Sequence, residues 1–399
     1  MRVAILNLTM RTVKSGLKFP QFDLSLPKEQ VRAEYPMVLL VADEIERMGN
    51  EVDVYSGSVY EIVRNSEAGE NRANVIYEKE SMRFLFPPFY YPYARDIPSK
   101  LKRGGYDVVL TSEFVQPASV QAMNVRNLRA NLFIWQELAS HPRFPISLAS
   151  RSVFLRVRMN GFAGFKKAIP RSKKALAFLR SQGIPDASIS RVVPNAVDCR
   201  TFSPVQEYDF FEKRMMNDVP SPRVLLAARI VKGKGIDTFL TAASIVRKEA
   251  PDVSFVIKGT GPDIQSVRQM ANRLGVEERV TFIEEFLPRK EFANLVASCD
   301  ICAAPSTQDL LFFIPLEAIA SGVPVVTATG SHHTETFADG RAGIVVPADD
   351  SKALAEALLT LVNDRQRLER MSVAARDLAV SEYSSEKVAN SLLEIFSGH

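Results

Sequence analysis

The stretch Asp309-Leu-Leu-Phe-Phe-Ile-Pro-Leu-Glu-Ala-Ile-Ala-Ser-Gly-Val-Pro-Val-Val326 decides the predicted fold. The apolar run 301–305 that precedes it suits a buried parallel strand. Pro315 marks the start of a helix, because its fixed φ suits the first turn and its missing N–H costs nothing there. Gly322 ends that helix, and residues 323–327 begin the next strand. This order predicts a βαβ unit whose loop lies at the edge where open α/β sheets bind ligands.

Two carboxylates, Asp309 and Glu317, flank the loop of this unit, eight residues apart. Glu317 falls in the first helical turn and is expected to accept hydrogen bonds from sugar or ribose hydroxyls, with Asp309 acting from the far side. The N–H groups and positive dipole end of the helix favour phosphate nearby. The alternative interpretation is an ordinary βαβ unit with two incidental acids, since short motifs also occur by chance.

The composition predicts a globular protein of two domains. The chain has 399 residues, 46% hydrophobic and 24% charged, and its net charge of +4 is too small to argue for nucleic acid by itself. The three cysteines fit a reducing compartment, and Cys299 and Cys302 are interpreted as buried thiols because no second pair completes a zinc site. No apolar run reaches the ~18 residues that span a bilayer, and the N-terminus turns polar too early for a secretory signal.

A second candidate site follows the predicted strand 223–228. Arg229-Ile-Val-Lys-Gly-Lys234-Gly235 places two cations at the carboxyl end of that strand. Such cations can neutralise a bound diphosphate and the negative charge that develops on it. A basic turn without this role is the alternative. The turn Gly259-Thr-Gly261-Pro262 follows the next strand and is weak evidence when taken alone.

Together these motifs resemble those of retaining GT-B glycosyltransferases of the family 4 type, the glycosyl transferases group 1. The family's E-G-F-G-x-x-x-L-E-A-x-A-x-G-x-P-V-V text is matched from Leu316 to Val326 and is altered at Asp309, Leu310 and Phe312. The loop 229–235 is similar to R-x-x-x-x-K-G, and residues 195–204 are similar to the N-G-V-D-x-x-x-F-x-P hinge, with alanine in place of glycine.

The resemblance implies an α/β fold of the GT-B type, with two Rossmann-like domains facing each other across a cleft. The domains are expected at residues 1–195, for the acceptor, and 196–375, for the nucleotide-sugar donor. Residues 376–399 are expected to form a helix that returns to the first domain.

The resemblance also implies roles for particular residues. Gln136 and Glu137 stand where relatives carry His-Asp, and His141 is a candidate substitute for that histidine. The loop 9–27 matches a family loop that faces both substrates, although it has only one glycine. The expected catalytic residues are Arg229, Lys234 and Asp309; the expected donor-binding residues are Gly261, Leu311, Phe312, Phe313, Glu317 and Gln136; the expected acceptor-binding residues are Ser15, Gly16 and His141.

The implied reaction moves a sugar from a nucleoside-diphosphate sugar to an acceptor with retention of anomeric configuration. No metal or cofactor is expected, since Arg229 and Lys234 supply the positive charge. Three alternatives stay open: an epimerase or hydrolase of nucleotide sugars on the same fold, a non-catalytic GT-B partner, and a nucleic-acid-binding module. The last lacks any recognised nucleic-acid motif, and no nucleic-acid partner is expected.

Residues 151–180 hold nine lysines and arginines, and no acidic residue occurs from Leu138 to Pro185. Apolar residues are interleaved with these cations. A solvated basic face is one interpretation. The functional interpretation is adsorption to anionic lipid, where each basic residue contributes about 1 kcal/mol. The sequence therefore predicts a cytoplasmic protein, peripheral at the inner face of the cell membrane, with an acceptor on a lipid carrier.

Overall fold

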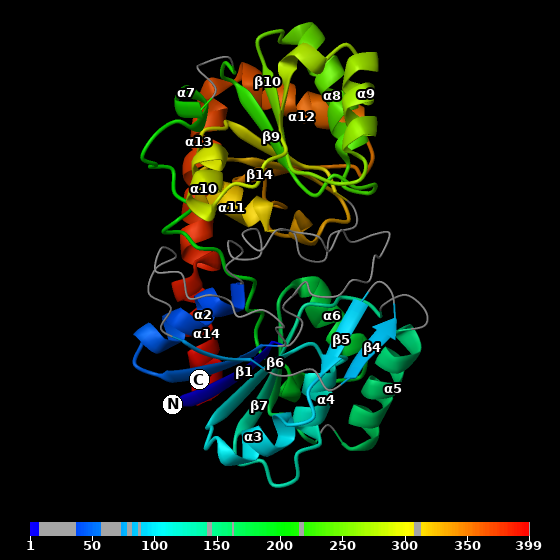
Figure 1. Cartoon of the computed structure of the whole chain (residues 1–399), viewed down its shortest axis with the longest axis vertical. Helices are drawn as coiled ribbons and strands as arrows, with labels where there is room; N and C mark the ends of the chain where they lie inside the picture. The colour runs from blue at the N-terminus through cyan, green and yellow to red at the C-terminus, as the bar shows by residue number, and fades with distance from the viewer. Residues whose placement is uncertain are drawn as a thin grey trace. The chain divides into compact units, whose positions relative to one another are not determined.

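The chain folds into two compact units (Figure 1). The computed structural model describes residues 1–7, 37–56, 73–77, 82–86, 89–141, 146–161, 163–214, 219–306 and 313–398. The first unit comprises Met1–Ala196 and Ser385–His399, and the second comprises Val197–Ser384. The carboxyl-terminal segment of the first unit therefore begins at Ser385, later than the predicted residue 376.

The first unit is built on a six-stranded parallel sheet with the strand order β3-β2-β1-β6-β7-β8. Its strands are β1 (Arg2–Asn7), β2 (Glu51–Ser56), β3 (Asn74–Tyr77), β6 (Val108–Ser112), β7 (Asn131–Gln136) and β8 (Lys167–Pro170). Its helices are α2 (Met37–Arg47), α3 (Ile97–Arg103), α4 (Pro117–Met123), α5 (Ile146–Met159), α6 (Lys173–Ser181) and α14 (Ser385–Ser397). The order reverses between β1 and β6, which makes that pair the topological switch point.

Burial explains the apolar character of β1. Val3, Ala4, Ile5 and Leu6 of β1 are all buried, as expected for a parallel sheet with helices on both faces. Helix α14 packs beside α2, so residues from the two ends of the chain share one layer (Figure 1).

The second unit repeats the same topology, with the strand order β11-β10-β9-β12-β13-β14. Its strands are β9 (Arg223–Ala227), β10 (Ser254–Lys258), β11 (Val280–Ile283), β12 (Ile301–Ala304), β13 (Val325–Ala328) and β14 (Gly343–Val346). Its helices are α7 (Phe210–Arg214), α8 (Ile236–Glu249), α9 (Ile264–Arg273), α10 (Arg289–Ala297), α11 (Ile314–Ala320), α12 (Ser351–Asn363), α13 (Arg365–Leu378) and a π-helical turn (Ala379–Tyr383). Its switch point lies between β9 and β12.

Successive residues of β9 point into two separate apolar layers. Leu225 and Ala227 join the cluster under α10, α11 and the end of α13. Val224 and Leu226 join the cluster under α8 and α12. A sheet buried on both faces needs apolar residues at every strand position, which accounts for the continuous apolar run at this point of the sequence.

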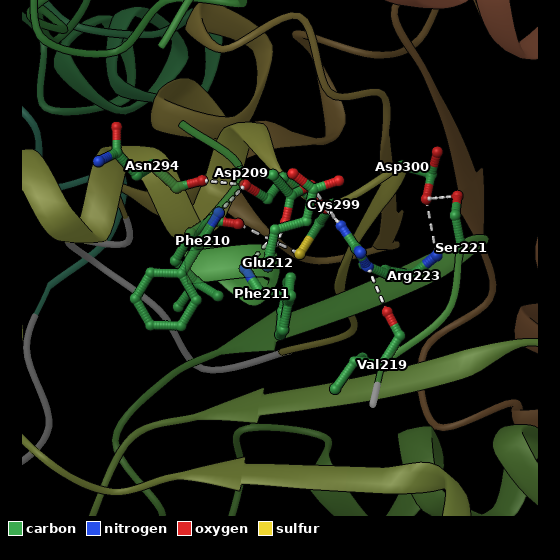
Figure 2. A network of polar contacts seen from close by, with 12 residues as sticks. Asp209, Phe210, Phe211, Glu212, Val219, Ser221, Arg223, Asn294, Cys299 and Asp300 are labelled. Atoms are coloured by element: carbon green, nitrogen blue, oxygen red, sulfur yellow. Dashed lines mark hydrogen bonds and ion pairs between the residues drawn. The ribbon is translucent and has the colours of Figure 1, made fainter. Parts of the chain in front are cut away.

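A segment rich in polar residues, 206–214, precedes the first strand of the second sheet. It contains α7, and Phe210 and Phe211 are fully buried. Figure 2 shows how the segment is anchored: Arg223 Nη1 donates to Asp209 Oδ2 at 2.6 Å, and the guanidinium lies 4.5 Å from the ring centre of Phe211. These contacts lie at the amino-terminal end of β9, opposite the edge at which parallel sheets bind ligands.

The first unit also contains an antiparallel pair formed by β4 (Met82–Phe86) and β5 (Phe89–Tyr93). One prediction about this unit is corrected. The interleaved aromatic residues of the basic stretch were expected at the surface, but Phe154 and Phe178 are buried in a core cluster. Of the cations in that stretch, Arg171 is buried as well.

Candidate functional site

Three loops meet at the carboxyl edge of the second sheet. Residues 228–235 connect β9 to α8, residues 259–263 connect β10 to α9, and residues 305–313 connect β12 to α11. Because β9 and β12 flank the switch point, residues 228–235 and the described ends of the third connection, residues 305–306 and 313, border the crevice in which such sheets hold ligands.

The loop that carries Arg229 and Lys234 is held by both of its neighbours. Ile230 N donates to Thr260 O at 3.0 Å, and Lys232 N donates to Asp263 Oδ2 at 2.9 Å. On the other side, the Ser306 hydroxyl donates to the Gly233 carbonyl at 3.2 Å. The two predicted cations therefore stand on a fixed backbone at the switch point, and both are half-buried.

Two glycines allow these loops to approach one another. A Cβ at Gly261 would lie 2.1 Å from the Ile230 carbonyl oxygen. A Cβ at Gly235, whose φ is +71°, would lie 2.7 Å from the Pro305 carbonyl oxygen. The close backbone contact between the loops is therefore a sufficient reason for glycine at position 261. Contact between Gly261 and a donor stays a prediction.

Glu317 lies in the first turn of α11, as predicted, and is half-buried. Burial, with a smaller contribution from the Glu317 carboxylate, raises the pKa of the Cys302 thiol to about 12. The Glu317 carboxylate is therefore close enough to β12 to affect the Cys302 thiol of that strand. Phe313 is half-buried and caps the same helix. Asp309, Leu311 and Phe312 lie outside the described residues.

In the first unit, the side chain of Gln136 is engaged at both ends. It is fully buried at the end of β7. Its Oε1 accepts from Phe114 N at 3.1 Å, and its Nε2 donates to Leu138 O at 3.1 Å. Because this side chain is buried in the structure, its contact with a donor sugar stays a prediction.

His141 lies between two aromatic rings. Its ring centre is 5.9 Å from that of Phe154 and 5.2 Å from that of Phe178, and its Nδ1 lies 2.8 Å from the Ser150 hydroxyl. Burial lowers its pKa, so the neutral imidazole is favoured. These contacts give His141 a packing role, and binding of an acceptor by it stays a prediction. Ser15 and Gly16 lie outside the described residues.

Sequence reasoning missed a polar cluster at the carboxyl edge of the first sheet. Its members are Glu113, Glu137, Arg171 and Asn195. Glu113 follows β6, Glu137 follows β7 and Arg171 follows β8. The signal that could have found them is a charged residue directly after each of three apolar strands.

Among the described residues, no group of three or more histidine, cysteine, aspartate or glutamate side chains is placed to hold a metal ion. Cys299 and Cys302 are buried free thiols, as predicted. No helix in the described ranges combines the length and the apolar character that a membrane span requires.

Comparison with known proteins shows that part of the second unit matches a known family. Residues 209–378 match the family described as glycosyl transferases group 1. A relative from Mycolicibacterium smegmatis, named GDP-mannose-dependent alpha-(1-6)-phosphatidylinositol monomannoside mannosyltransferase, is 31% identical over 54% of this chain and 57% of its own length. Alpha-maltose-1-phosphate synthase from the same organism is 29% identical over 55% of this chain and 59% of its own length. The chain thus spans little more than half the length of these curated relatives.

Solved structures share the fold over the whole chain. Anabaena HepE in complex with UDP has a TM-score of 0.73 at 17% identity, and each chain is fully covered. A glycosyltransferase from Rickettsia africae has a TM-score of 0.73 at 16% identity, with 100% and 98% coverage. The chain therefore has the GT-B fold, and its residues 209–378, which carry the Arg229–Lys234 loop and Glu317, match the glycosyl transferases group 1 family.

Proposed function

We propose that this protein transfers a glycosyl group from a nucleoside-diphosphate sugar to an acceptor, with retention of anomeric configuration, and that the second unit binds the donor. The observation that carries the proposal is the Arg229–Lys234 loop at the switch point of the second sheet, pinned on both sides. The family match covers this loop completely.

In the proposed mechanism, the two cations act on the diphosphate. Arg229 and Lys234 offset its charge in the bound donor and the additional charge that appears on the leaving oxygen as the glycosidic bond breaks. Hydrogen bonds from the loop to Thr260 and Asp263, and one from Ser306 to the loop, fix it beforehand, so little reorganisation is needed when that charge develops. The departing phosphate takes the proton of the acceptor hydroxyl, so no protein nucleophile is required.

For the nucleotide end, we propose that Glu317 accepts hydrogen bonds from the ribose hydroxyls. Its place in the first turn of α11, next to the end of β12, supports this. Asp309 is proposed to face the sugar. The mannosyltransferase relatives make GDP-mannose the first donor to test and a lipid bearing an inositol headgroup the first acceptor.

The reaction is tested by incubating the protein with a panel of nucleotide sugars, with and without a lipid acceptor fraction. Glycosyl transfer predicts that nucleoside diphosphate appears in step with glycosylated acceptor. Release of nucleotide at the same rate without acceptor would favour a hydrolase or epimerase instead. A protein that binds the nucleotide sugar but turns over none would be a non-catalytic partner.

We also propose that helix α5 adsorbs to anionic lipid from the cytoplasmic side. Leu148, Leu155 and Met159 are 60%, 58% and 77% exposed, although they are large and apolar. Their spacing of seven and four residues places them on one helix face. Arg151 and Arg158 follow Leu148 and Leu155 by three residues each and flank that face. An exposed apolar row between cations suits the boundary between headgroups and acyl chains.

Vesicle sedimentation tests this surface. Binding to vesicles rich in phosphatidylglycerol should exceed binding to phosphatidylcholine vesicles and should weaken as salt rises. The double substitution Leu155→Glu and Met159→Glu should abolish binding. Val373→Glu, at a 64% exposed position on α13, is the matched control and should bind like the wild type. Equal binding to both kinds of vesicle would overturn the proposal.

A further inference from the structure

The carboxyl edge of the first sheet carries a buried polar cluster that the proposed chemistry does not use. Glu113 and Arg171 are each 8% exposed, and Glu137 and Asn195 are half-buried. Their positions bring together the ends of β6, β7 and β8. Glu113 directly follows β6, one of the two strands at the switch point of this sheet.

Glu113 joins two loops through its side chain. Its Oε1 accepts from Glu137 N at 2.7 Å, and its Oε2 accepts from Leu138 N at 3.1 Å. Both amides belong to the first residues after β7, so one carboxylate fixes the backbone of the next loop along the edge. A carboxylate with two N–H donors forms stronger bonds than a neutral acceptor would.

Arg171 extends this arrangement across the edge. Its Nη1 donates to Glu137 Oε2 at 3.3 Å and to Asn195 Oδ1 at 2.9 Å, and its Nη2 donates to the Ser112 hydroxyl at 3.3 Å. The guanidinium lies 4.1 Å from the ring centre of Trp135. Asn195 Nδ2 in turn donates to Glu137 Oε1 at 3.1 Å.

The backbone of Glu113 is also strained. Its φ is +57°, in the left-handed region that residues with a Cβ seldom adopt. Such conformations persist only where the surroundings hold them, and they concentrate at functional sites. The residue with this conformation is the one whose side chain bonds the loop after β7.

We propose that Glu113 is a positioning residue: its ionised carboxylate holds the backbone of residues 137 and 138 in place at the ligand-binding edge of the first unit. Protonation weakens this hold, because a neutral carboxyl group is a poorer acceptor and must place its own proton. The inference assigns Glu113 an effect on the loop geometry and no contact with substrate.

The ionisation of this group falls near neutral pH. Burial, with a smaller contribution from the charge of Glu137, raises the pKa of Glu113 to about 7, against the lowering effect of the Arg171 charge and the two backbone N–H groups. Among the described residues, Arg171 and Glu137 are the charged groups that face this carboxyl group. The hold on the loop should therefore strengthen as pH rises through the neutral range.

The backbone amide NMR signals of Glu137 and Leu138 test the proposal in the free protein, whether or not the proposed transfer reaction exists. Both signals should titrate together, with a midpoint near the pKa of Glu113. Glu113→Gln should remove that titration. Glu46→Gln is the matched control, because Glu46 Oε1 accepts from Val52 N at 3.2 Å at the opposite edge of the same sheet. It should leave both titrations unchanged.

Two results would overturn the proposal: no titration of either amide in the wild type, or the same titration in Glu113→Gln. If Glu113→Gln does not fold, Glu113→Asp replaces it. The shorter carboxylate keeps the charge but cannot reach both amides, so only one of the two signals should still titrate.

The pH dependence of catalysis links the positioning role of Glu113 to the proposed function. This test rests on that function. Wild-type kcat/KM should rise about tenfold between about pH 6 and about pH 8, following the ionised fraction of Glu113. In Glu113→Gln the rise should shrink to less than about twofold. If kcat/KM of this variant still fell at acidic pH as much as in the wild type, the positioning role would be contradicted even if the NMR titration is seen. Absence of transfer in the wild type would refute the proposed function, and the amide signals would still decide the role of Glu113.

Discussion

Glu317 and Asp309 flank one loop but are proposed to serve different parts of the donor. Glu317→Ala should weaken binding of the free nucleoside diphosphate by roughly 1.5–3 kcal/mol, the scale of a hydrogen bond to a charged group. Asp309→Ala should leave that affinity nearly unchanged and should remove discrimination among sugars. Calorimetry with the diphosphate and with its sugars measures both effects. Equal losses of diphosphate affinity in the two variants would refute this division.

Glu113 should also make the stability of the first unit depend on pH. Its pKa in the folded protein, about 7, lies above the ordinary value of 4.5, so the protonated form is the one that folding favours. Its contribution is present below about pH 4.5 and is lost as pH rises to about 7, for a total of about 3 kcal/mol.

Urea unfolding at a series of pH values measures this dependence. The fluorescence of Trp135, the single tryptophan, reports on β7 and thus on the first unit. In Glu113→Gln the loss of unfolding free energy with rising pH should be smaller than in the wild type, whereas Glu46→Gln should keep the wild-type slope. Identical slopes in all three proteins would contradict the titration assigned to Glu113.

At the scale of the elements, helix α7 is held in place by side-chain contacts that the composition of the sequence does not reveal. Arg223 Nη1 bonds Asp209, and its Nε donates to Val219 O at 2.7 Å (Figure 2). Arg223→Ala should therefore destabilise the second unit by about 2–4 kcal/mol, since it leaves buried acceptors without partners. Chemical unfolding measures the loss. Arg365→Ala, which removes an exposed ion pair on α13, should cost less than about 0.5 kcal/mol.

The sequence predicted well those elements whose pattern is local. Strands β9 and β12 lie in the predicted runs 223–228 and 301–305, and helix α11 lies between its predicted start near Pro315 and its stop at Gly322, because a short apolar run or a pair of start and stop signals defines each of them. Elements with conflicting signals were missed. The polar residues around Phe210 masked α7, and the cations of residues 151–180 masked the core role of Phe154 and Phe178.

The two candidate sites also differ in how well the sequence predicted them. The loop from Arg229 to Lys234 is contiguous, and the spacing of its cations after a strand predicted its place. The Glu113 cluster joins residues that lie far apart in the sequence, from positions 113 to 195, and becomes visible only when the strand order is known. A prediction made residue by residue could not have found it.

Over the whole molecule, the chain passes between its units at 196–197 and again at 384–385. Within the second unit the two passages are tied together: Val197 N donates to Tyr383 O at 2.8 Å, and Val197 forms a parallel bridge with Ser384. Arg376 fixes the first passage further, because its guanidinium donates to the carbonyls of Cys199 at 3.0 Å and Phe202 at 2.9 Å. The predicted hinge at residues 195–204 spans the first of these passages.

The central claim is that Arg229 and Lys234 stabilise the negative charge of a departing nucleoside diphosphate. Its most direct test is the turnover rate with a saturating nucleotide sugar and acceptor, measured for the wild type and for Arg229→Ala, Lys234→Ala and Lys232→Ala. Lys232 is an exposed cation of the same loop that bonds Asp263 through its backbone only, which makes it the matched control. Turnover should fall at least ~100-fold in the first two variants and stay near the wild-type rate in the third. Unchanged turnover in Arg229→Ala and Lys234→Ala would contradict the account.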